Sequence, residues 1–181
     1  AAGEQVMSLV EQNITIRDIV KPSSFLNALT VDMALGCSTN SVLHLAAIAN
    51  EARIPFQLKD VNAVSSRTPN LCRLAPAGKH HIQDLHNAGG VSAVMHELTK
   101  GNLLDASLLT VTGKTIDENI AHSYPKDFSV IRPYENPYSS TGGLAVLFGS
   151  LAPNGAVVKK SAVAPEMLVH QGPARVFESE E

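Results

Sequence analysis

The 181-residue sequence predicts an α/β chain in which a helix-rich part is followed by short strands. Two observations predict this order. Apolar residues recur at helical spacing through the first 100 residues, and after residue 130 they gather in short runs bounded by proline, glycine and asparagine. Hydrophobic residues make up 44% of the chain, which excludes a disordered protein.

Six segments have the pattern of helices. They lie at residues 4–10, from Pro22 to the break at Gly36, and at 42–49, 60–66, 82–88 and 91–100. The segment 42–49 is apolar nearly all round, so we expect a buried helix there. Thr115 and Glu118 have the spacing of a capping box and predict a further helix start.

Short apolar runs predict strands at residues 108–112, 130–132, 144–148, 155–159 and 174–177. The segment 133–143 is rich in proline, glycine and serine and indicates a domain boundary. We therefore divide the chain into residues 1–137 and 138–181. About 40 strand-rich residues are too few for an independent core, so the second part is expected to begin a larger β domain.

The composition excludes several classes of protein. The formal net charge is −3 and no basic cluster occurs, which argues against nucleic acid as a partner. No apolar run approaches the roughly 18 residues of a membrane helix. Cys37 and Cys72 are too few for a metal knuckle or a disulfide framework, which favours a reduced, cytoplasmic setting.

The surface and the first residue also suggest that more polypeptide is needed. Charged residues make up only 17% of the chain, below the usual value of about 25%, so we expect part of the surface to be covered. The chain opens with Ala1 in place of methionine, which suggests a piece of a longer protein.

The segment from Gly36 to Asn40 is the first candidate for ligand binding. Ser38, Thr39 and Asn40 stand where a helix begins, and a helix N-terminus offers free N–H groups and partial positive charge to a carboxylate or phosphate. The alternative is that Ser38 or Asn40 only caps the helix. Capping and ligand binding can coexist, because a cap uses only some of the free N–H groups at the helix N-terminus.

Other polar groups favour structural roles. His80, His81, Asp84 and His86 could hold a metal, but without a further ligand a short solvent-facing helix start explains them better. His44 fits a hydrogen-bonded core histidine. Lys159 and Lys160 could recruit an anion, although paired lysines on a strand usually protect a sheet edge.

Eight segments spread over nearly the whole chain carry a resemblance to a known family. They are VDMALGCSTN at 31–40, RTPNLC at 67–72, DLHNAGG at 84–90, TVTGKT at 110–115, RP and ENPYS at 132–139, GGLAVL at 142–147, LAPNGAVVK at 151–159 and GPARVF at 172–177. In this order they resemble the dihydroxy-acid and phosphogluconate dehydratase family, and the dihydroxy-acid enzymes more than the sugar-acid ones.

The resemblance implies a cytoplasmic, homodimeric hydro-lyase that converts 2,3-dihydroxy-3-methyl acids to 2-oxo acids in valine and isoleucine biosynthesis. It implies that residues 1–137 end an N-terminal α/β domain and that residues 138–181 begin a swivelling β-barrel-like domain. It also implies an iron–sulfur cluster, which acts as a Lewis acid, and a magnesium ion that holds the substrate. A sugar-acid dehydratase and a non-catalytic small-anion-binding module remain alternatives.

The family's Cys-Asp-Lys motif and its serine base in a Thr-Asp-Gly-Arg-type segment do not occur in this sequence. We therefore expect no catalytic residue, no metal ligand, no bound cofactor and no activity in this chain alone. The expected contribution to a site is substrate binding by Ser38, Thr39 and Asn40, and by Gly142 and Gly143 near the domain cleft.

Overall fold

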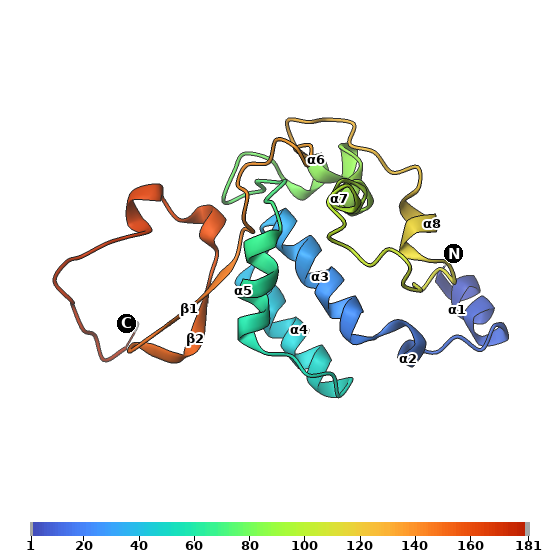
Figure 1. Cartoon of the computed structure of the whole chain (residues 1–181), viewed down its shortest axis with the longest axis horizontal. Helices are drawn as coiled ribbons and strands as arrows, with labels where there is room; N and C mark the ends of the chain where they lie inside the picture. Colours follow the sequence, from blue (N-terminus) through green and yellow to red (C-terminus); the bar gives the residue numbers. More distant parts are fainter. Residues whose placement is uncertain (1, 180–181) are drawn as a thin grey trace.

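A computed structural model describes residues 2–179 and shows a helical body from which one β-hairpin and the C-terminal segment extend (Figure 1). The helices are α1 (Ala2–Glu11), α2 (Ile16–Ile19), α3 (Pro22–Leu35), α4 (Thr39–Glu51), α5 (Leu58–Arg67), α6 (Ile82–Asn87), α7 (Gly90–Thr99) and α8 (Ile116–Ile120). The strands are β1 (Ala145–Gly149) and β2 (Ala152–Val158), followed by 3₁₀ turns η1 (Lys160–Ala162) and η2 (Pro165–Met167).

Helix α3 is the central element of the body and contacts α4, α5 and α7. Pro22 stands in its first turn, where a missing N–H costs nothing, and Gly36 ends it with a left-handed φ of 61°. Two apolar cores meet along this helix. One joins Ala34 and Leu35 to residues of α6 and α7, and the other joins Leu29 and Met33 to residues of α4, α5 and β1.

Strands β1 and β2 form an antiparallel hairpin in which Val146 pairs with Val157. The hairpin is fixed to α5 by one side chain. Asn62 donates from Nδ2 to Val146 O at 2.7 Å and accepts at Oδ1 from Val146 N at 2.8 Å. Asn62 thus pairs with β1 much as a neighbouring strand would, and the edge of the sheet is covered by a helix.

The six helices expected from the pattern are all present, and the Thr115–Glu118 capping box starts α8. Two of the five expected strands are confirmed, in β1 and β2. The other three expected strands, at 108–112, 130–132 and 174–177, were wrong, and helix α2 was not expected.

These corrections have local causes. Leu109 makes only an isolated bridge to Thr115, across a turn. Ile131 N donates to Asp127 O, which closes a turn where a strand was expected. The segment 174–177 lies exposed, with no strand to pair with in the part of the chain that the structure describes. Short apolar runs are ambiguous because a strand needs a partner as well as a pattern.

Helix α4 is less buried than its composition predicts. Only Val42 and Ala49 are buried, while Leu43 is 66% and Ile48 52% exposed. One side of α4 packs on α3 and the hairpin, and its other apolar side faces outward. None of the helices between residues 2 and 179 has the length and apolar character needed to cross a bilayer.

Candidate functional site

The loop 36–38 connects α3 to α4, and with Thr39 it forms one wall of a cavity, called here the Ser38 pocket. Ser38 is the N-cap of α4, and its Oγ accepts a hydrogen bond from Asn40 N at 3.2 Å. The capping interpretation is therefore confirmed. The cap leaves other donors free, because the N–H groups of Ser38 and Thr39 have no acceptor among residues 2–179.

A lysine from a distant part of the chain reaches the same loop. Lys159, directly after β2, donates from Nζ to Gly36 O at 2.7 Å. The Ser38 pocket encloses about 500 Å³ and is lined by Leu35, Gly36, Cys37, Ser38, Thr39, Leu74, Ala75, Pro76, His81, Ile82 and Lys159. None of the carboxylates between residues 2 and 179 lines it. Lys159 and the start of α4 make this pocket suited to an anionic group.

Gly142 and Gly143 differ from Ser38 and Thr39 because their backbone N–H groups are already hydrogen-bonded. Their N–H groups donate to Ser65 O at 2.8 Å and to Met33 O at 3.0 Å, so neither is free for a ligand. A Cβ built on Gly142 would lie 2.7 Å from Met33 Cβ. The two glycines let the chain cross closely over the end of α3, beside the loop that bears Ser38. Their contact with a substrate stays a prediction.

Asn40 is exposed and does not line the Ser38 pocket. Its backbone N–H is the group that the Ser38 cap uses. Of the five candidate residues, the structure thus brings Ser38 and Thr39 into one pocket, whereas Gly142 and Gly143 line a neighbouring one.

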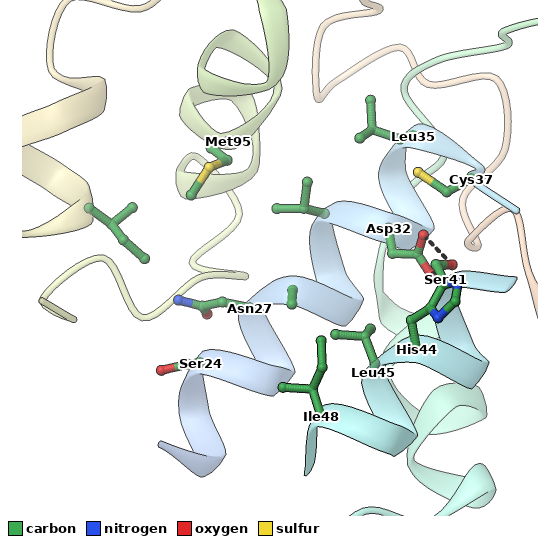
Figure 2. Close-up of a pocket in the computed structure, with 13 residues that line it drawn as sticks. Ser24, Asn27, Asp32, Leu35, Cys37, Ser41, His44, Leu45, Ile48 and Met95 are labelled. Atoms are coloured by element: carbon green, nitrogen blue, oxygen red, sulfur yellow. Dashed lines mark hydrogen bonds between the residues drawn. The ribbon is translucent and has the colours of Figure 1, made fainter. Parts of the chain in front are cut away.

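A second cavity of about 600 Å³ is lined mainly by residues of α3 and α4, with Met95 of α7 (Figure 2). Its walls are mostly apolar, with Leu45, Ile48 and Met95 among them, and Asp32, Ser41 and His44 gather at one end. Ser41 Oγ lies 2.8 Å from both carboxylate oxygens of Asp32.

Burial raises the pKa of the Asp32 carboxyl, while hydrogen bonds from Ser41 and Cys37 and the charge of Lys159 oppose that rise. Because this end of the cavity holds a carboxyl group, it suits an anionic ligand less well than the Ser38 pocket does.

Comparison with known proteins identifies the family. Residues 1–119 match the model described as dihydroxy-acid/6-phosphogluconate dehydratase N-terminal, and residues 129–181 match the C-terminal model of the same family. The chain belongs to this dehydratase family. The predicted resemblance is confirmed over nearly the whole sequence.

Similar curated proteins named dihydroxy-acid dehydratase come from Carboxydothermus hydrogenoformans, at 65% identity, and from Acetivibrio thermocellus and Ruminiclostridium cellulolyticum, both at 63%. Each alignment covers 99% of this chain and 32% or 33% of the relative. The chain therefore spans about a third of the length of the relatives it matches.

The two cysteines of the chain lie in or against the apolar core. Burial, followed by the charge of Asp32, raises the pKa of the Cys37 thiol to about 12, and burial raises that of Cys72 to about 12. Cys72 is fully buried, as expected of a small core residue, and Cys37 is half-buried against the same core.

The histidine cluster has a structural role. Asp84 accepts a hydrogen bond from His81 N at 2.7 Å and so caps α6, and His80 Nδ1 lies 4.0 Å from its carboxylate. Between residues 2 and 179, no group of three or more His, Cys, Asp or Glu side chains could hold a metal ion.

From the sequence, Lys159 and Lys160 could recruit an anion or protect a sheet edge, and the structure gives both side chains specific partners. Lys159 Nζ donates to Gly36 O, and Lys160 Nζ donates to Thr141 Oγ1 at 2.9 Å. Lys159 and Gly36 are 123 positions apart, so no local pattern could have revealed their contact.

Proposed function

We propose that this chain is a segment of a dihydroxy-acid dehydratase, a hydro-lyase that converts 2,3-dihydroxy-3-methyl acids to 2-oxo acids in valine and isoleucine biosynthesis. The observation that carries the proposal is the identity of 58% to 65% over 180 residues with relatives that bear this name. The related sugar-acid reaction is the alternative, because the family description also includes 6-phosphogluconate dehydratase.

The substrate of such an enzyme is a carboxylate at neutral pH, and its carboxylate must be oriented before water can leave. The Ser38 pocket supports a role in this step. Lys159 supplies a positive charge, and the free N–H groups of Ser38 and Thr39 can donate to the oxygens. Gly142 and Gly143 contribute by allowing the close crossing that brings the segment after β2, with Lys159, to the loop.

In the complete enzyme the expected iron–sulfur cluster and magnesium would supply Lewis-acid chemistry, with ligands outside this chain. No chemical step is assigned to residues 2–179. We propose further that residues 1–137 belong to the N-terminal domain and that β1–β2 is the first hairpin of a swivelling β domain starting at residue 138. A cytoplasmic homodimer completes the proposal.

Substrate comparison with the complete polypeptide tests the function. We expect 2,3-dihydroxy-3-methylbutanoate to give a 2-oxo acid with a kcat/KM on the order of 100 times that for 6-phosphogluconate, since selective sites discriminate through transition-state contacts. A preference for 6-phosphogluconate would instead assign the sugar-acid reaction. The 181-residue chain alone is expected to form no 2-oxo acid.

Calorimetric titration of the chain alone with a 2-oxo acid tests the small-anion-binding alternative. A silent titration would remove support from that alternative.

A further inference from the structure

A smaller cavity lies between the helical body and the segment that follows β2, and we call it the Lys160 pocket. It encloses about 230 Å³ and is lined by Asn70, Arg73, Tyr138, Ser139, Thr141, Gly142, Gly143, Lys160, Ser161, Val163, Pro165 and Leu168. The Gly36–Gly143 crossing separates it from the Ser38 pocket. The adjacent residues Lys159 and Lys160 thus serve two different cavities.

Cationic and donor groups line the Lys160 pocket, and no carboxylate of residues 2–179 lies among them. Among the residues that the structure describes, Lys160 Nζ bonds only the Thr141 hydroxyl, which leaves other ammonium hydrogens available. The Arg73 guanidinium lies 4.9 Å from the centroid of the Tyr138 ring. Within residues 2–179, neither cation has an acidic partner within 4.0 Å.

Ser161 adds an unsatisfied polar group to this wall. Its Oγ is buried and has no hydrogen-bond partner in the described part of the chain, while its backbone N–H donates to Gly143 O at 3.0 Å. A buried hydroxyl without a partner is unfavourable and rare in folded proteins. The stacked guanidinium, the ammonium group and this hydroxyl therefore form a donor-rich wall without a charged acceptor.

We propose that the Lys160 pocket binds the oxyanion group of a small molecule, a carboxylate or a phosphate, through Arg73 and Lys160. Arginine presents a planar set of donors that suits both groups, and lysine adds a point charge. The proposal rests on this cavity and not on the dehydratase assignment. A ligand held here would contact both the helical body and the segment after the hairpin.

Calorimetric titrations of the complete polypeptide with inorganic phosphate and with acetate test the proposal, at constant ionic strength set with chloride. We expect saturable binding of at least one anion. Arg73→Gln and Lys160→Met should each raise its Kd at least tenfold, whereas Lys160→Arg should keep it within threefold. Saturation by phosphate alone indicates a phosphate group, and saturation by acetate indicates a carboxylate.

Lys59→Met is the matched control, because Lys59 is exposed on α5 and lies outside this pocket. Its Kd should equal that of the unmodified protein. Circular dichroism and dehydration activity of each variant report on folding and on the proposed function separately. Absence of saturable binding in the unmodified protein would overturn the proposal. So would a Kd in Arg73→Gln and Lys160→Met that equals the Kd of the unmodified protein.

Discussion

Gly36 and Gly143 cross so closely that a side chain at position 143 would collide with the backbone of Gly36. A Cβ built on Gly143 would lie 2.5 Å from Gly36 Cα, and one built on Gly36 would lie 3.1 Å from Ser161 Oγ. This crossing joins the end of α3 to the segment that enters β1. It also separates the Ser38 pocket from the Lys160 pocket, so its geometry controls the shape of both.

Gly143→Ala should therefore destabilise the protein by about 3 kcal/mol, because the new methyl group meets backbone that cannot move aside easily. The midpoint of thermal unfolding measures this loss. Gly149→Ala is the control, since a Cβ there meets nothing within 4 Å, and its effect should stay within about 0.5 kcal/mol. Equal midpoints for the two variants would contradict the close crossing.

The link between α5 and the hairpin makes a second prediction. Asn62→Ala removes both hydrogen bonds to Val146 and leaves a buried backbone N–H and C=O unpaired. We expect a loss of about 2 kcal/mol in the free energy of unfolding, measured in urea. Asn50→Ala, at an exposed position of α4, should change it by less than about 0.5 kcal/mol. A loss for Asn62→Ala no larger than that of the control would show that the link is not stabilising.

The raised pKa of Asp32 predicts how stability varies with pH. Burial lifts its folded-state pKa above the ordinary value of 3.8, so the folded protein binds a proton more readily than the unfolded chain. Stability from this group therefore increases as the pH falls through the folded pKa, and the ionised buried form is unfavourable above it.

Asp32→Asn should remove this dependence. The free energy of unfolding of Asp32→Asn minus that of the unmodified protein should be largest near pH 7. This difference should decrease toward pH 4, because the unmodified protein gains stability there. Urea unfolding at several pH values measures the difference. A relative stability of Asp32→Asn that increases with acidity would show that the sign is wrong.

Alkylation of the cysteines tests their environment. A pKa of about 12 in place of 9.0 lowers the thiolate fraction of Cys37 about a thousandfold at neutral pH, so iodoacetamide should react at least ~100 times more slowly than with unfolded protein. Asp32→Asn should accelerate the reaction at Cys37 and leave Cys72 slow, because Asp32 raises only the pKa of Cys37. Mass spectrometry of the two cysteine peptides separates the rates, and fast labelling of folded Cys37 would refute the prediction.

Lys159→Met in the complete enzyme tests the Ser38 pocket. Methionine keeps much of the side-chain length and removes the charge, so the KM for the dihydroxy acid should rise roughly tenfold with little change in kcat. Lys159→Arg should recover most of the loss. Steady-state kinetics measure both values, and the exposed Lys59→Met serves as the control. An unchanged KM would exclude Lys159 from substrate binding.

Much of the helical body could be predicted from the sequence, because the signals are local. Helical spacing of apolar residues, Pro22 at the start of α3, Gly36 at its end and the Thr115–Glu118 box act within a few residues. The same holds for the Ser38 cap. The strand predictions succeeded less often, since the segments at 108–112 and 174–177 have suitable residues but no partner strand.

The family could also be identified from the residues alone, because its motifs are continuous and occur in order along the chain. The Ser38 pocket and the Lys160 pocket could not be identified in this way. Lys159 meets Gly36, Asn62 meets Val146 and Gly143 meets Gly36 across at least 84 positions, and such contacts depend on how the helices and the hairpin pack. Local preferences specify the elements, whereas burial and long-range hydrogen bonding determine which distant groups share a cavity.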